Sequence, residues 1–168
     1  IFRDLTVKDN IDLALQNSSY SRAAIRNRRE QLINEFNLNN FVDSYGYQLS
    51  GGERRRCEIA RALTVGRKGP KYLLLDEPFA GIDPLAVNDL KKLILKLSSD
   101  GVGILITDHN VRETLLITNK SYVLSEGKIL ANGSSSELAV NPIVKKYYFC
   151  LLYTSDAADE GLGVDLGG

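Results

Sequence analysis

The chain has 168 residues, of which 43% are hydrophobic and 25% are charged. This composition is ordinary for a globular protein and excludes a chain that is disordered or fibrous throughout. Lys plus Arg and Asp plus Glu each total 21, so the formal net charge is zero. A dedicated nucleic-acid binder carries a basic excess, so we expect no nucleic-acid partner. The two cysteines and the single histidine exclude a four-cysteine or multi-histidine metal site.

No stretch approaches the roughly 20 apolar residues of a membrane-spanning helix, and the start shows no signal-peptide pattern. The chain begins with Ile1 and contains no methionine. The sequence therefore predicts a fragment that lacks its N-terminal part.

The first third of the chain reads as helical. Thr6 is placed to cap a helix that runs to Leu15, and apolar residues at helical spacing predict a second helix over 25–36. Ser50 is placed to cap a third helix that runs to Val65. This segment is therefore expected to form a helical subdomain.

Alternating strands and helices follow. Residues 71–76 and 102–107 are short, continuous apolar runs, which predict strands buried on both faces. Pro84 begins the helix between them. The turn residues Glu126-Gly127 predict a β-hairpin, and a last helix begins near Ser135. This alternation indicates an α/β fold with a mainly parallel sheet.

Four segments in chain order carry residues suited to phosphate chemistry. They are Leu49-Ser50-Gly51-Gly52-Glu53, Leu73-Leu74-Leu75-Asp76-Glu77-Pro78, Ala80-Gly81-Ile82-Asp83-Pro84 and Ile104-Leu105-Ile106-Thr107-Asp108-His109. A helix N-terminus preceded by glycines exposes N–H groups that bind anions, although a Ser-Gly-Gly taken alone is more often a plain helix cap with glycines for the turn.

The two predicted strands each end in residues that can act on a phosphate. Asp76 lies at the carboxyl edge of the sheet, where open α/β folds bind ligands, and its carboxylate suits Mg²⁺. Glu77 could accept a proton from an attacking water. His109 ends the neighbouring strand and could donate a hydrogen bond to the transferred phosphate. Each residue taken alone could also be an ordinary surface side chain.

Taken in this order and spacing, the four segments resemble the ATP-binding cassette (ABC) ATPase family. They are similar to its signature motif, its Walker B strand with the catalytic glutamate, its D-loop and its switch histidine. The resemblance implies part of a P-loop NTPase fold. Residues 1–65 would be the helical subdomain, and residues 66–149 would be the C-terminal part of the RecA-like catalytic core.

The resemblance also implies roles for single residues and for partners. Glu77 and His109 would be catalytic, and Asp76 would bind Mg²⁺. The ATP site would include residues of the signature and the D-loop, namely Ser50, Gly51, Gly52, Glu53 and Asp83. ATP and Mg²⁺ would be the cofactors, and the partners would be a second ATPase subunit and transmembrane permease subunits.

Within the family, the segments 53–56, 76–84 and 107–115 resemble the ATPase subunits of bacterial lipopolysaccharide export, as does the opening segment 1–10. Such a subunit would lie in the cytoplasm, on the inner face of the inner membrane. Two alternatives stay open. One is the ATPase subunit of a branched-chain amino-acid importer, and the other is an ABC ATPase of DNA repair or chromosome organisation.

Two departures from the family pattern stand out. The sequence contains no G-x-x-x-x-G-K-[ST] phosphate loop, so we expect the chain alone to be inactive. Residues 150–168 resemble a translated sequencing adapter and hold four acidic residues with no Lys or Arg. We expect this tail to be non-native, which would leave the rest of the chain with a net charge of about +4.

Overall fold

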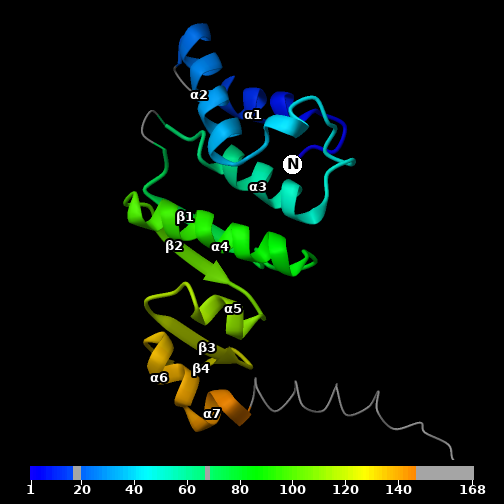
Figure 1. Ribbon diagram of the computed structural model, residues 1–168. Helices are drawn as coiled ribbons and strands as arrows, with labels where there is room; N and C mark the ends of the chain where they lie inside the picture. The colour runs from blue at the N-terminus through cyan, green and yellow to red at the C-terminus, as the bar shows by residue number, and fades with distance from the viewer. Residues whose placement is uncertain (17–19, 67–68, 147–168) are drawn as a thin grey trace, which may run out of the picture. The chain divides into compact units, whose positions relative to one another are not determined.

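A computed structural model describes residues 1–16, 20–66 and 69–146 (Figure 1). Contacts within the chain group into two compact units, Ile1–His109 and Asn110–Gly168. We describe each unit by itself. The boundaries predicted at residues 65 and 149 stay predictions, and the tail predicted at 150–168 lies outside the described residues.

The first unit opens with the three helices that the sequence predicts, which are α1 (Val7–Gln16), α2 (Arg22–Glu35) and α3 (Gly51–Ala62). A short 3₁₀ helix, η1 (Asn39–Phe41), lies between α2 and α3 and was not predicted. The extent predicted for the third helix is wrong, because α3 ends at Ala62 and not at Val65. The Thr64 N–H and hydroxyl both donate to the Arg61 carbonyl, at 3.1 and 2.7 Å, and this tightens the last turn and stops the helix.

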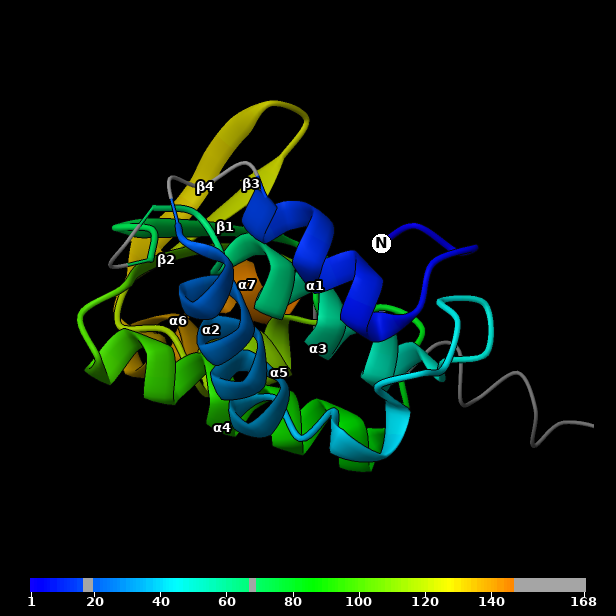
Figure 2. The ribbon, with the colours of Figure 1, turned by 90° about the horizontal axis from the view of Figure 1, so that it is seen from above.

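These helices share one apolar core. Helix α1 packs against both α2 and α3 (Figure 2). The core side chains are at most 2% exposed and come from all three helices and the loop after α2: Val7, Ile11, Leu15, Leu32, Phe36, Leu38, Cys57 and Ile59. Burial raises the pKa of the Cys57 thiol to about 11, so this cysteine serves as a neutral core residue.

A buried amide, which no sequence pattern predicted, fixes the segment before α1. Asn10 is fully buried, and its Oδ1 accepts a 2.8 Å hydrogen bond from the Phe2 N–H. Its Nδ2 donates to the carbonyls of Phe2, Leu5 and Thr6 at 3.0–3.1 Å. An asparagine can satisfy donors and acceptors at once, whereas an aspartate can only accept.

We therefore expect Asn10→Asp to lower the free energy of unfolding by about 2–4 kcal/mol, because it buries a charge and sets a carboxylate oxygen against carbonyl oxygens that the amide had bonded. Urea unfolding of the 168-residue chain measures this loss. Asn34→Asp on the exposed part of α2 is the control and should change stability by less than about 0.5 kcal/mol. Equal losses in the two variants would contradict the role given to Asn10.

The rest of the first unit is a strand–helix–strand motif. Strands β1 (Tyr72–Asp76) and β2 (Gly103–Thr107) pair in parallel, with Leu74 opposite Leu105 and Asp76 opposite Thr107. Helix α4 (Pro84–Ser99) connects them and buries Leu90, Ile94 and Leu97. The parallel strand pair and Pro84 at the first turn of the helix are as predicted. The pairing brings the carboxyl ends of both strands together.

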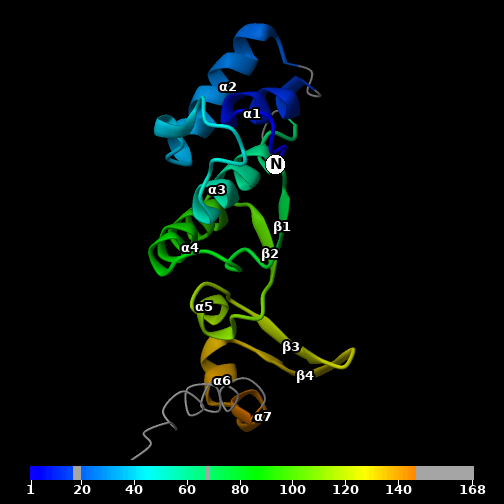
Figure 3. The same ribbon diagram turned by 90° about the vertical axis from the view of Figure 1, so that its right-hand side faces the viewer.

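The prediction that both strands are buried on two faces is wrong. Leu73 and Leu75 are buried, but Leu74 is 73% exposed and its neighbour Leu105 is 61% exposed. Helix α4 lies on one face of the strand pair (Figure 3). The exposure of Leu74 and Leu105 indicates that their side chains lie on the other face. A continuous apolar run shows that both faces tolerate burial, but it does not show what covers them.

The second unit is built on a hairpin. Helix α5 (Val111–Leu115) precedes strands β3 (Ser121–Ser125) and β4 (Lys128–Gly133), which are antiparallel. Glu126 and Gly127 have φ angles of 49° and 74°, as a two-residue type I′ turn requires, so the predicted hairpin is confirmed. Helices α6 (Ser135–Val140) and α7 (Pro142–Val144) complete this unit, and Val123, Leu138 and Val144 form its core.

Helix α6 begins with a capping box. The Ser134 N–H donates to Glu137 at 2.7 Å, and the Glu137 N–H donates to the Ser134 hydroxyl at 3.3 Å. The hydrogen bonds that the Ser134 N–H and the Ser134 hydroxyl (2.8 Å) donate to the Glu137 carboxylate hold the pKa of this carboxyl below its usual value.

Throughout the described part of the chain, no helix combines the length and apolar character needed to span a membrane.

Candidate functional site

The paired strands of the first unit end in polar side chains that contact each other. Asp76 ends β1 and Thr107 ends β2, and the Thr107 hydroxyl donates to Asp76 Oδ1. Asp76 is otherwise exposed to solvent. A carboxylate at this edge is open to a ligand while its strand is fixed by the sheet.

Glu77 follows β1 in an unusual backbone conformation. Its φ angle is 45°, in the left-handed region that non-glycine residues seldom adopt. Its N–H donates to the Thr107 carbonyl at 2.7 Å. This conformation brings Oε1 of Glu77 within 3.5 Å of Nδ1 of His109. The two predicted catalytic side chains are 56% and 70% exposed, so both can reach a ligand from solvent.

A buried carboxylate supports the loop after Glu77. The Asp108 side chain is fully buried, and its Oδ2 accepts a 3.1 Å hydrogen bond from the Phe79 N–H. No sequence pattern assigned a role to Asp108 or to Thr107. Thr107 could have been found as a polar residue at the carboxyl end of a predicted strand, whereas no local pattern identifies the partner of Asp108.

The N-terminus of α3 carries the predicted signature residues. Ser50 caps the helix, and its hydroxyl accepts a 3.3 Å hydrogen bond from the Glu53 N–H. The Glu53 carboxylate accepts a 2.8 Å hydrogen bond from the Ser50 N–H, which completes a capping box. Glu53 therefore stabilises the helix start, and its predicted place in an ATP site stays a prediction.

The two glycines of this segment allow a close approach between α3 and α4. A Cβ added to Gly51 would lie 2.8 Å from the Gly81 carbonyl oxygen, and one added to Gly52 would lie 2.6 Å from the Ala86 Cβ. Asp83 caps α4 through a 3.0 Å hydrogen bond from the Ala86 N–H. The structure thus brings the signature segment and the segment 80–84 together, so that two helix N-termini meet.

We expect Gly52→Ala to lower the free energy of unfolding by about 1–3 kcal/mol, because its new methyl group would overlap that of Ala86. The double variant Gly52→Ala/Ala86→Gly removes the overlapping atom and should recover most of this loss. Urea denaturation of the three chains provides the comparison. A double variant no more stable than Gly52→Ala would show that the glycine is not needed for packing.

The predicted residues thus form two groups in the first unit. Asp76, Glu77 and His109 form one group at the strand ends, and the signature residues form another with Asp83. Among the residues that the structure describes, no group of three or more His, Cys, Asp or Glu side chains could hold a metal ion. Asp76 alone still suits Mg²⁺, which is usually held by one or two carboxylates together with substrate phosphates and waters.

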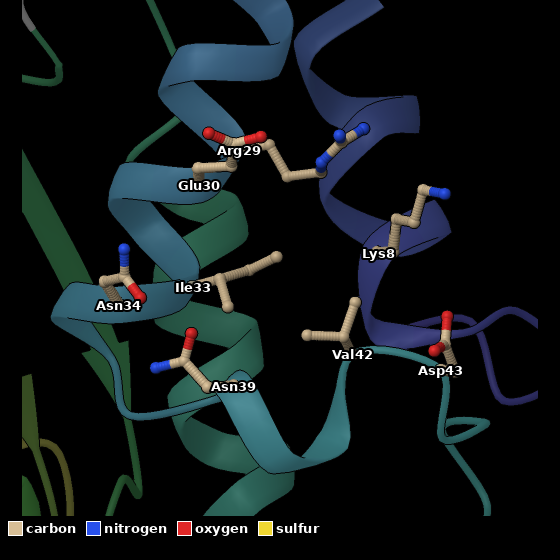
Figure 4. A pocket seen from close by; sticks show the side chains of 8 residues that line it. All are labelled: Lys8, Arg29, Glu30, Ile33, Asn34, Asn39, Val42 and Asp43. Carbon is tan, nitrogen blue, oxygen red and sulfur yellow. The ribbon is translucent and has the colours of Figure 1, made fainter.

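A separate cavity lies between α1, α2 and the η1 segment (Figure 4). Its volume is about 390 Å³, and its lining combines two apolar side chains with acidic, basic and amide side chains. Its lining residues are Lys8, Arg29, Glu30, Ile33, Asn34, Asn39, Val42 and Asp43. It contains none of the predicted site residues.

Known proteins with a similar sequence and a similar fold are ATP-binding cassettes. The family model described as ABC transporter matches residues 1–80. The ATP-binding cassette MJ1267, solved in its ADP conformation, superposes with a TM-score of 0.72 at 25% identity, over 88% of this chain and 64% of that one. CbiO1 from Clostridium perfringens gives 0.73 at 25% identity, over 93% and 62%. The chain is therefore similar to the ATP-binding domain of ABC transporters, and it carries part of the P-loop NTPase fold of these cassettes.

Among curated proteins, the chain is similar to ATP-binding proteins of lipopolysaccharide export. The lipopolysaccharide export system ATP-binding protein LptB of Acidithiobacillus ferridurans is 47% identical over 148 residues, which are 88% of this chain and 60% of that protein. LptB of Escherichia coli K12 is 47% identical over 149 residues, or 88% and 61%. The chain therefore spans about three fifths of the length of these relatives.

Proposed function

We propose that this chain belongs to the ATP-binding and ATP-hydrolysing subunit of an ABC transporter that powers the extraction of lipopolysaccharide from the inner membrane. The contact between Glu77 and His109, beside Asp76 at the ends of β1 and β2, is the observation that carries the proposal. The identity with proteins named LptB supports the choice of cargo.

The strand-end group supplies the residues for hydrolysis. The Glu77 carboxylate orients the attacking water and accepts its proton. The His109 imidazole, held 3.5 Å from Glu77, donates a hydrogen bond to the phosphate being transferred. Asp76 would hold Mg²⁺, which neutralises charge on the ATP phosphates when it is bound. The Thr107 hydroxyl orients the Asp76 carboxylate for this role.

The signature group supplies a second phosphate contact. The positive end of α3 would bind the terminal phosphate of an ATP molecule held by a second subunit. The donors there are the N–H groups of Gly51 and Gly52 and the hydroxyl of Ser50. Glu53 holds the start of this helix in place. Asp83, which caps the adjoining helix, would couple the two ATP sites across the homodimer.

We assign each part of the chain a place in the transporter. Residues 1–65 form the helical subdomain, and residues 66–149 form the C-terminal part of the catalytic core. We place the subunit on the inner face of the inner membrane, bound to the transmembrane subunits of the transporter. Residues 150–168 take no part in this function.

Two measurements test the proposal. The printed sequence contains no G-x-x-x-x-G-K-[ST] loop, so turnover is measured in a fusion that places the N-terminal part of Escherichia coli LptB before Ile1. We expect Mg²⁺-dependent ATP hydrolysis by this fusion and none by the 168-residue chain alone. The absence of turnover in a folded fusion that binds ATP would contradict the proposal.

The cargo is tested through the partner. Co-expression of the fusion with the transmembrane subunits of lipopolysaccharide export should give a stable complex on purification. The transmembrane subunits of a branched-chain amino-acid importer serve as the matched control and should not be retained. If the fusion were retained by the importer subunits and not by the lipopolysaccharide export subunits, the proposed cargo would be wrong. The proposed ATPase activity would be unaffected.

A further inference from the structure

The backbone of Glu77 is held from two different elements. Its N–H donates to Thr107 at the end of β2, and its carbonyl accepts a 3.0 Å hydrogen bond from Nη2 of Arg55 on α3. The Ala80 N–H donates to the same carbonyl at 3.2 Å. The φ angle of 45° at Glu77 therefore lies between two anchored peptide groups. A non-glycine residue stays in this region only when its surroundings enforce it.

Arg55 is itself fixed in place. Its Nη1 donates to Oε2 of Glu58, one helical turn further along α3, at 2.8 Å. The Arg55 side chain is only 27% exposed, so it is partly shielded from water. A guanidinium is planar and offers its donors at fixed angles, so a hydrogen bond at one nitrogen orients the other. Glu58 thus aims Nη2 of Arg55 at the Glu77 carbonyl.

We propose that Arg55 is a positioning residue that keeps Glu77 in its left-handed conformation and so sets the direction of the Glu77 carboxylate toward His109. Arg55 lies five residues after Ser50 on the helix that begins with the signature segment. It therefore links the signature helix directly to the backbone of the proposed catalytic glutamate. Neither the sequence patterns nor the four motifs assign this role to Arg55.

The catalytic meaning of this link rests on the proposed function, but its geometry can be tested without ATP. His109 is the single histidine of the chain, so its imidazole C–H signals are easily identified in an NMR spectrum. A histidine signal shifts when a neighbouring carboxylate moves or is neutralised. The spectrum of the 168-residue chain thus reports the position of Glu77, whether or not the chain hydrolyses ATP.

The experiment compares four chains with the unsubstituted one. Glu77→Gln gives the His109 signals expected when the carboxylate is lost. We expect Arg55→Gln to move the His109 signals in the same direction and to speed hydrogen exchange of the Glu77 N–H by about 10-fold or more. In the double variant Arg55→Gln/Glu77→Gln, the second change should add no further shift. Arg26→Gln, at an exposed arginine of α2, should leave the His109 signals unchanged.

The outcomes separate positioning from general stability. His109 signals that are unmoved in Arg55→Gln but moved in Glu77→Gln would overturn the proposal, and so would His109 signals that do not respond to Glu77→Gln. If Arg55→Gln does not fold, Arg55→Lys replaces it, because lysine keeps the charge but loses the two-pronged geometry. Arg55→Lys should also move the His109 signals toward those of Glu77→Gln, and unchanged signals in a folded Arg55→Lys chain would count against the inference.

Discussion

Glu77→Gln should reduce kcat for ATP in the fusion with Escherichia coli LptB by about 100-fold or more, with little change in ATP binding. The substitution keeps the size of the side chain but removes its negative charge and its ability to accept a proton. The left-handed backbone is anchored by bonds to the Glu77 peptide groups and not by its carboxylate, so the loop should keep its conformation. Steady-state turnover and ATP titration separate the two effects.

Glu30→Gln is the matched control for this prediction. Glu30 is exposed on α2 and belongs to neither group of proposed site residues. Its substitution should leave kcat within about twofold, since surface changes away from such features have small effects. If Glu77→Gln and Glu30→Gln had similar turnover, Glu77 would not be the proton acceptor.

Leu15→Ala should lower the free energy of unfolding by about 2–5 kcal/mol. Leu15 is fully buried in α1, within the core shared by the first three helices. Alanine removes the apolar surface of leucine from this core and leaves a cavity that the neighbouring helices fill only in part. Urea unfolding of the 168-residue chain, followed by circular dichroism, measures the loss.

Leu13→Ala on the same helix is the control, because Leu13 is 40% exposed. Both substitutions make the same chemical change and have the same effect on helix propensity, so the difference between them reports burial. We expect Leu13→Ala to cost less than about 1 kcal/mol. Similar losses at the two positions would contradict the core described for α1.

Features with a local cause could be predicted from the sequence. Ser50 with Glu53 forms a capping box within four residues, and Pro84 begins α4 directly after its cap. The Glu126-Gly127 turn requires only that two adjacent residues accept positive φ angles. Each of these signals lies within a few neighbours, so the chain specifies the element whatever the surrounding packing.

Features that depend on distant contacts could not be predicted in this way. The Arg55 side chain meets a carbonyl 22 positions further along the chain, and Asp108 receives an N–H from 29 positions earlier. The exposed face of β1 and β2 is a similar case. The apolar run at 71–76 does not reveal which of the two strand faces a helix covers and which stays exposed. These contacts follow from how the elements pack, which no short pattern records.

The site shows the same division. The sequence placed Asp76, Glu77 and His109 at strand ends, and the parallel register of β1 and β2 is what brings these ends together. No sequence pattern predicted the left-handed backbone of Glu77, because glutamate has no preference for that region of φ and ψ. The residue types were thus evident from the sequence, whereas the geometry that sets the Glu77–His109 distance came from the fold.

The two strand pairs differ in how far the chain must travel to form them. Strands β3 and β4 are joined by a turn of two residues, whereas β1 and β2 meet only after the whole of α4 has been placed between them. A hairpin closes in about 1–10 μs, and pairing across a long crossover is slower because a larger loop must be ordered first. We therefore expect the hairpin of the second unit to pair early in folding. The edge that holds Asp76 and His109 should pair later, because the chain must first order α4 between the two strands.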